Sequence, residues 1–481
     1  MAAPPRPFRV ALLLATCVAA LAVQSSASPR KPATPAAVAA APLPTWAQVD
    51  ALVRNQKFEE AAGAVLRILD AARERGDDAE WTKALVRQTQ LRLGLHGYET
   101  AVRFLKDTPW PPGMLAQTTL DLFYAQALVQ YERMNSWEIG QREKVESAGL
   151  VDLKAWTRAQ LLEEAEKAYR RAWDRRAALG ELPVGALAEF VEPNDYPRDV
   201  RGTLRDAVSY LFAELLADSS LWTPEQSNGT YRLDVPGLLA SDGHGADALL
   251  ADPAVHPVAK LVAVLGDLEA WHAGRAERAA ALEARVERLR RLHGAFVDES
   301  DRAAIRKDLA SRLTDYRDIP WWAMGMAELA AFHQAEGAPD NLISARASAL
   351  EALRAYPQSP GGRRANRFVA DIEAPEYEAT SMSSDAPGRR SIRVMHKNLA
   401  SLFFRAYRID FDESVAARFG MRPSTSDVRS MLADRPEAQW ESLLPATADF
   451  KLHATYVTPP MRETGAYVIV VSVRRDFAEA D

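Results

Sequence analysis

The feature that most constrains this sequence is a helical periodicity that begins at Trp46 and continues to about residue 371. Apolar residues recur at three and four positions along this stretch, and clusters of Gly, Pro and Asp interrupt them. This spacing places apolar side chains on one face of successive α-helices, whereas half-buried strands would alternate apolar and polar residues. The pattern predicts a mainly helical chain in which many helices pack on one another.

Two stretches resemble variants of one structural unit. Phe58-Glu-Glu-Ala61 and Tyr98-Glu-Thr-Ala101 each place an aromatic residue three positions before a small one, at a repeat distance of 40 residues. That distance suits one helical hairpin, in which the alanine lets two helices approach closely and the aromatic fills the groove beside it. In Tyr356-Pro-Gln-Ser-Pro360, proline ends one helix before the next begins near Arg363. These features resemble tetratricopeptide repeats, with an irregular period and without the usual glycines.

The aromatic residues of the periodic region are predicted to be core. A long amphipathic helix is expected from Ala155 to Leu179, and its apolar side carries Trp156, Leu162, Ala165, Tyr169 and Trp173. A carbohydrate-binding platform would instead need aromatics on an exposed face, so core packing is favoured over a ligand site. The same interpretation covers other tryptophans at comparable positions: Trp137, Trp271, Trp321 and Trp322.

The pattern of apolar residues changes near residue 375. Ile392, Val394, Leu402 and Phe404 belong to alternating runs, and Tyr467 to Val473 is rich in β-branched residues. These patterns predict strands, with a short helix inserted from Asp427 to Leu432. The predicted fold class is α+β, mainly α: a tetratricopeptide-like helical-hairpin array over residues 45–373, followed by an antiparallel β-sandwich domain over residues 374–481.

The N-terminal 44 residues are predicted to lie outside both domains. Arg6 and Arg9 precede an apolar run from Val10 to Val23, and small residues follow it. The run of about 14 residues is shorter than the roughly 18 to 20 that a membrane-spanning helix requires, and no second candidate appears downstream. We therefore expect a signal peptide over residues 1–27, cleaved near Ala27, and a flexible Pro/Ala-rich linker over residues 28–44. Export would deliver the chain to the periplasm or the extracellular space.

The only cysteine, Cys17, lies within the predicted signal peptide. A mature chain without cysteine excludes disulfides, thiolate zinc sites and a cysteine nucleophile. A lipid anchor at Cys17 is disfavoured because Thr16 occupies the position where a lipidated cysteine usually follows Gly, Ala or Ser. Folding must then rest on burial of apolar surface. A mature chain of about 450 residues predicts more than one domain.

The charge of the chain gives no indication of a nucleic-acid partner. There are 59 basic and 65 acidic residues, a net charge of −6, and removal of the signal peptide would leave −8. Charges of both signs are interspersed, and the short basic run from Arg285 to Arg291 is interpreted as a solvated helix face.

Familiar catalytic motifs are absent from the sequence. It contains no His-Glu-x-x-His, no Gly-x-Ser-x-Gly and no phosphate loop. His256, His272 and His293 are 16 and 21 residues apart, too far for two metal ligands on one helical turn. The clustered carboxylates Asp298, Glu299 and Asp301 precede a helical stretch, where they are expected to cap the helix. No catalytic, cofactor-binding or metal-binding residue is predicted, and the chain is not expected to be an enzyme.

The order of signal, tether, helical array and β domain is similar to the beginning of bacterial alpha-2-macroglobulin proteins. The stretch from Ile392 to Asp410 resembles that family's strand, Lys-Asn turn and following strand, and Gly465-Ala-Tyr467 resembles the start of its closing strand. Upstream, Asp152 to Trp156 and Thr203 to Leu211 resemble the family's helical N-terminal region. The resemblance covers nearly the whole chain.

The resemblance implies a role in protease trapping, in which a protease cuts a bait segment and is enclosed by a conformational collapse. Many members add a thioester built on Cys-x-Glu-Gln, which this sequence lacks, so no catalytic residue is carried over. The chain ends at Asp481 without the later macroglobulin domains, and we expect a fragment, a truncated reading frame or one part of a split protein. Its expected partners are proteases or downstream macroglobulin domains.

Two other hypotheses remain open at this point. The chain could be an independent periplasmic scaffold that binds peptides or cell-envelope proteins, as tetratricopeptide arrays do. It could also be an enzyme with a site of unfamiliar pattern.

Overall fold

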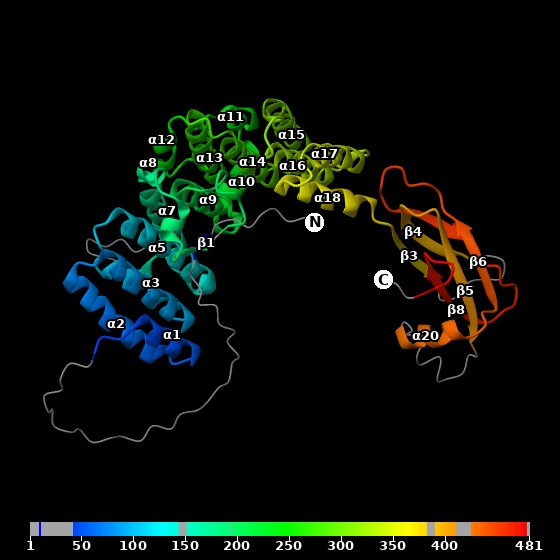
Figure 1. The fold of residues 1–481 in the computed structure, drawn as a ribbon, viewed down its shortest axis with the longest axis horizontal. Coiled ribbons are helices and arrows are strands. Elements are labelled where there is room, and N and C mark those ends of the chain that lie inside the picture. The colour runs from blue at the N-terminus through cyan, green and yellow to red at the C-terminus, as the bar shows by residue number, and fades with distance from the viewer. Residues whose placement is uncertain are drawn as a thin grey trace, which may run out of the picture. The chain divides into compact units, whose positions relative to one another are not determined.

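The computed structural model describes residues 9–10, 42–143, 152–192, 194–381, 390–409 and 425–478. Cys17, the cleavage point near Ala27 and most of the 28–44 linker lie outside the described residues. The described chain is mainly helical and carries two small antiparallel sheets near its C-terminal end (Figure 1). It divides into two compact units, one within Pro4–Asp308 and one within Leu309–Asp481.

The first unit is built almost entirely of helices. Its longer helices contact their neighbours in sequence order, for example α2 with α3, α5 with α7 and α13 with α14. The α-helices are α1 (Trp46–Arg54), α2 (Phe58–Arg75), α3 (Asp78–Gly94), α4 (Tyr98–Asp107), α5 (Met114–Met134), α6 (Ser136–Gly140), α7 (Arg158–Asp174), α8 (Arg176–Leu179), α9 (Leu204–Ala217), α10 (Pro224–Gly229), α11 (Val235–Ala240), α12 (Ala246–Ala251), α13 (Pro257–Gly274), α14 (Arg278–Ala295) and α15 (Glu299–Leu313), whose last residues enter the second unit. Short 3₁₀ helices lie between them: η1 (Leu153–Ala155), η2 (Val184–Leu187), η3 (Ser219–Leu221) and η4 (Thr230–Arg232).

One turn recurs between these helices. Gln56, Gly76 and His96, spaced by 20 residues, adopt left-handed φ angles of 59°, 65° and 59°, and Ala276 does so at 56°. After each, the next backbone N–H donates to the carbonyl five residues earlier, as in Lys57 to Leu52 at 2.9 Å. This is the Schellman arrangement that ends a helix and satisfies its last carbonyls. It joins α1 to α2, α2 to α3, α3 to α4 and α13 to α14.

Ala276 gives a direct test of this turn. A non-glycine residue in the left-handed region is strained by roughly 1 to 2 kcal/mol. Glycine removes this strain, but it also gives the unfolded chain more conformational entropy, which offsets part of the gain in stability. We expect Ala276→Gly to stabilise the first unit by about 0.5 to 1 kcal/mol, measured by chemical unfolding with far-ultraviolet circular dichroism. The control Ala273→Gly, within the last turn of α13, should destabilise it by about 1 kcal/mol. A loss at both positions would contradict the left-handed turn.

The small residues of the two related stretches lie in the helical core. Phe58 and Tyr98 are the first residues of α2 and α4, and Ala61 and Ala101 are fully buried. Each alanine N–H donates to the carbonyl of the residue before its helix, at 2.9 Å in both cases.

The single helix predicted from Ala155 to Leu179 is wrong. The structure has η1, a break at Trp156, then α7 and a separate α8. The break follows from a capping box: the Thr157 hydroxyl accepts from the Gln160 N–H, and the Gln160 side chain accepts from the Thr157 N–H. Because Thr157 caps α7, Trp156 stays in extended backbone and outside the helix.

The core interpretation of the tryptophans holds only in part. Trp173, Trp321 and Trp322 are buried as predicted, and Trp271 is half-buried. Trp137 is wrong as a core residue because it is 80% exposed on the short helix α6.

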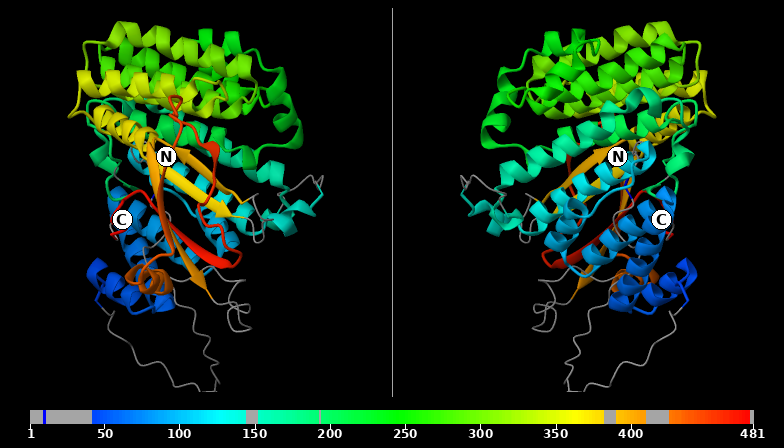
Figure 2. Two further views of the ribbon diagram at one scale, coloured as in Figure 1. Left: turned by 90° about the vertical axis from the view of Figure 1, so that its right-hand side faces the viewer. Right: turned by 90° about the vertical axis from the view of Figure 1, so that its left-hand side faces the viewer.

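The second unit combines helices and strands. Helices α16 (Trp322–Ala335), α17 (Asn341–Ala355) and α18 (Pro360–Glu373) lie side by side after the 3₁₀ helix η5 (Thr314–Tyr316) (Figure 2). Strands follow from Glu376: β3 (Glu376–Ser381), β4 (Ile392–Lys397), β5 (Ser401–Ile409), β6 (Ala438–Leu443), β7 (His453–Val457) and β8 (Ala466–Ser472). The short helix predicted from Asp427 to Leu432 is confirmed as α20 (Thr425–Ala433). Helix gives way to strand after Glu373, whereas the compact units divide at Asp308.

The strands form two antiparallel sheets of three, in the orders β3-β4-β7 and β6-β5-β8. Both sheets contribute to one apolar cluster, with Ile392 and Val394 from β4 and Leu402 and Phe404 from β5. The alternation of buried and exposed residues predicted for these two strands is confirmed. The loop between them is held against the end of α18, because the Asn398 side chain donates to the Ile372 carbonyl at 2.8 Å.

A further pair of short strands involves the N-terminus. The residues of β1 (Arg9–Val10) pair antiparallel with those of β2 (Val191–Glu192). Because β1 lies within the predicted signal peptide, cleavage near Ala27 would remove it. None of the helices in the described ranges combines the length and apolar content needed to cross a membrane.

Candidate functional site

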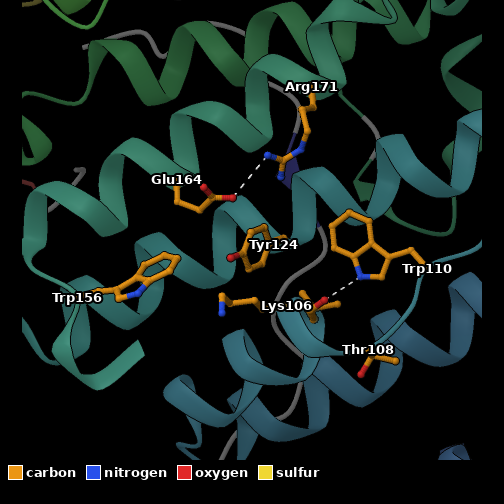
Figure 3. A pocket seen from close by; sticks show the side chains of 8 residues that line it. Lys106, Thr108, Trp110, Tyr124, Trp156, Glu164 and Arg171 are labelled. Atoms are coloured by element: carbon orange, nitrogen blue, oxygen red, sulfur yellow. Dashed lines mark hydrogen bonds and ion pairs between the residues drawn. The ribbon is translucent and has the colours of Figure 1, made fainter. Parts of the chain in front are cut away.

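One concave site is a pocket of about 340 Å³ in the first unit, called here the aromatic pocket. Its walls come from the end of α4, the connection to α5, the middle of α5, the segment before α7, and the middle and last turn of α7 (Figure 3). The lining residues are Leu105, Lys106, Thr108, Trp110, Tyr124, Trp156, Glu164 and Arg171.

Local structure explains why two tryptophans face this pocket. The Trp110 indole N–H donates to the Leu105 carbonyl at 2.8 Å, which folds the connection back over the end of α4. Trp110 then meets Tyr124 edge to face, with ring centroids 6.1 Å apart. On the other side, the capping box at Thr157 leaves Trp156 in the extended segment before α7. The interpretation of Trp156 as a helix-core residue is therefore wrong, since it is half-buried and lines a pocket.

The charged groups around the aromatic pocket are nearly balanced. The Arg171 Nε donates to the buried Asp121 carboxylate at 2.8 Å, and its Nη1 lies 3.5 Å from Glu164. The Lys106 ammonium lies 5.5 Å from the Trp156 ring centroid and 3.9 Å from Asp107. Arginine and lysine thus each have an acidic neighbour.

Tyr124 carries a hydroxyl group that is available for a hydrogen bond to a ligand. Its side chain is only 4% exposed, yet its hydroxyl has no hydrogen-bond partner among the described residues. Burial, reinforced by the charge of Glu164, raises the pKa of Tyr124 above its ordinary value. The hydroxyl is therefore a neutral donor and acceptor at physiological pH.

A second concave site, the apolar groove, lies between α7, α9, α10, α12 and α13 and has a volume of about 580 Å³. Its floor is apolar and includes Leu162, Leu215, Leu221, Trp222 and Pro257. Its exposed rim carries the ion pair of Lys167 with Glu163 at 2.7 Å, and the buried Lys260 pairs with Glu166 inside the groove.

His272 sits between two carboxylates in the same unit. Its Nε2 is 2.8 Å from Asp206 and its Nδ1 is 2.7 Å from Glu277, with the histidine and Asp206 both buried. Burial alone would lower the pKa of His272, but the two carboxylates outweigh it and raise the pKa above its ordinary value. Asp206 also caps α9 through Thr203. These contacts link α9 to the end of α13 and the residue before α14.

The run from Arg285 to Arg291 is not the solvated face predicted from the sequence. Arg285 and Arg288 are 4% and 0% exposed. Arg285 pairs with Asp308 at 2.7 Å, and Arg288 pairs with Glu269 at 2.8 Å. These partners lie on other helices, which is why the basic run can be buried.

The other titratable residues discussed from the sequence cap helices or are buried within them. Asp298 accepts from the Ser300 backbone N–H at 2.9 Å at the start of α15, which confirms its capping role. His256 caps α13 by accepting from the Val258 N–H, and His293 is buried on α14. Within the described residues, no group of three or more His, Cys, Asp or Glu side chains could hold a metal ion.

Sequence reasoning missed the aromatic pocket and the apolar groove. The aromatic pocket depends on two signals that the sequence does contain, the Thr157–Gln160 capping box and the prolines after Trp110. The apolar groove depends on contacts between helices far apart in sequence, which no local pattern reveals. No protein-family model, curated protein or solved structure matches the chain.

Proposed function

We propose that this chain is a protein-binding scaffold, the N-terminal portion of an exported protease-trapping protein of the alpha-2-macroglobulin type. In this proposal the first unit is a tetratricopeptide-like array of helical hairpins, and the strands of the second unit are an antiparallel macroglobulin-like sandwich. The recurrent turn at 20-residue intervals and the apolar cluster shared by the two sheets support these assignments. The resemblance of the sequence segments supports the family.

The observation that carries the binding role is the apolar groove. Its floor of leucine, tryptophan and proline side chains suits an extended apolar segment of a partner protein. Its rim carries paired charges that provide a polar border, as at ordinary protein interfaces. A groove between helices is also how helical arrays and bundles commonly receive peptides.

Leu162 gives the test of this role. It lies on the groove floor and is only half-buried, so a substitution there alters the groove before it alters the core. Binding of the chain to a macroglobulin segment that carries the bait and thioester domains would be measured by calorimetry. We expect Leu162→Lys to weaken binding at least tenfold, about 1.4 kcal/mol, because a charge would enter the apolar floor.

The matched control is Leu66→Lys on α2, where the leucine is 38% exposed and outside the groove. The control should bind like the unchanged chain. Equal affinity of the Leu162 and Leu66 variants would exclude the groove as the contact. A failure of the unchanged chain to bind this segment would favour the independent scaffold, whose partners are other cell-envelope proteins.

A further inference from the structure

The aromatic pocket has the composition of a small-molecule site, and its chemistry is distinct from that of the apolar groove. Its volume of about 340 Å³ falls at the lower end of the roughly 300 to 1,000 Å³ typical of ligand pockets. We propose that it binds a neutral pyranose sugar. This inference does not depend on the proposed role of the chain in protease trapping.

The walls of the pocket suit a sugar ring. Trp110, Tyr124 and Trp156 provide three aromatic rings, with Trp156 opposite Trp110 across Lys106 and Tyr124 (Figure 3). A pyranose ring has apolar C–H faces that pack on aromatic rings, while its hydroxyls project from the ring edge. Because both tryptophans are only half-buried, part of each ring remains available to a ligand.

The polar groups of the pocket suit hydroxyls. Tyr124 is almost completely buried, and its hydroxyl faces the pocket without a hydrogen-bond partner in the described part of the chain. Glu164 supplies an acceptor, and Lys106, Arg171 and Thr108 supply donors. A sugar hydroxyl both donates and accepts, so it can use this mixed set, whereas a hydrocarbon ligand would leave it unsatisfied.

Charge decides between a neutral and an ionic ligand. An anionic ligand would be repelled by Glu164, and a cationic ligand would be repelled by Lys106 and Arg171. Arg171 is already neutralised by Asp121 and lies 3.5 Å from Glu164, and Lys106 is 3.9 Å from Asp107. With the two signs balanced, neither kind of ion gains net attraction, and a neutral polyhydroxylated ring is favoured.

The test is direct binding to the full chain by calorimetry and saturation-transfer nuclear magnetic resonance. The neutral probes are glucose, N-acetylglucosamine and their β-1,4-linked disaccharides. The charged comparisons are glucuronic acid and glucosamine. We expect neutral sugars to bind with dissociation constants on the order of millimolar, and the two charged sugars to bind at least fivefold more weakly.

Tyr124→Phe is the diagnostic variant. The hydroxyl has no partner in the described protein, so its removal should leave the unfolding midpoint unchanged while it weakens sugar binding about tenfold. Trp156→Ala should abolish detectable binding, because it removes one aromatic wall. The matched control is Trp137→Ala, which removes an 80% exposed tryptophan outside the pocket and should leave sugar affinity unchanged.

Three results would overturn the proposal. The first is the absence of any neutral-sugar signal at concentrations of tens of millimolar. The second is equal binding of neutral and charged sugars. The third is sugar affinity that is the same in Tyr124→Phe and the unchanged chain, since binding would then occur elsewhere.

Discussion

Replacing Arg201 by methionine is expected to destabilise the first unit by about 3 to 5 kcal/mol, the usual cost of removing one partner from a buried ion pair. The Arg201 guanidinium lies 2.6 Å from Glu283 and 3.2 Å from Glu287, and the side chains are 1%, 0% and 6% exposed. It also lies between the rings of Tyr196 and Tyr210, with centroid distances of 3.8 and 3.5 Å. Glu287 would keep Arg290 and Arg291, but Glu283 would lose this ion pair.

Urea unfolding followed by circular dichroism measures this effect, and two variants control it. Lys57→Met removes an exposed pair with Glu60, in which the side chains are 54% and 60% exposed, and should cost less than about 1 kcal/mol. The double variant Arg201→Met/Glu283→Leu removes both buried charges and should recover much of the loss. An Arg201→Met midpoint close to that of Lys57→Met would show that the ion pair is not buried in solution.

Replacing Ala101 by tryptophan should destabilise the first unit by about 1 to 3 kcal/mol or more through overpacking. Ala101 is fully buried on α4, which contacts both α3 and α5. A large ring there must displace helices that are already in contact. Thermal unfolding of Ala101→Trp would be compared with that of Thr100→Trp, the exposed neighbouring position on the same helix. Equal melting temperatures would place Ala101 outside a helix contact.

The sequence predicts the elements of this fold better than their junctions. Apolar periodicity identifies the long helices and the alternating strands, because each depends on residues close in sequence. The recurrent turn is visible only at Gly76, since Gln56, His96 and Ala276 adopt left-handed backbone without glycine. Its 20-residue spacing therefore emerges from the structure.

The burial of charged and aromatic side chains is the least predictable property. Arg285 and Arg288 look like a solvated run, but their partners Asp308 and Glu269 lie on neighbouring helices. Local pattern cannot show that α14 is covered on several sides. The core predictions for Trp156 and Trp137 are wrong for a similar reason. A capping box and a helix end, not the apolar periodicity, decide where these two side chains lie.

The two candidate sites also differ in how far local sequence patterns indicate them. The aromatic pocket is formed by residues between 105 and 171, and its two tryptophans adjoin prolines and a capping box that can be read from sequence. The apolar groove joins α7 to α13, and Lys260 meets Glu166 across 94 positions. Only the packing of the helices brings these groups together.

We propose that this chain acts as a scaffold rather than as an autonomous protease inhibitor. The most direct measurement incubates the purified chain alone with a broad-specificity protease, then follows gel mobility after denaturation and residual activity on small and large substrates. A covalent adduct of the family type needs a thioester, and the sequence has no cysteine after Cys17. We expect no adduct and no selective loss of activity on large substrates. Robust inhibition by the chain alone would contradict it, and residues 410–445, of which 410–424 lie outside the described structure, would be the first segment to search for an inhibitory loop.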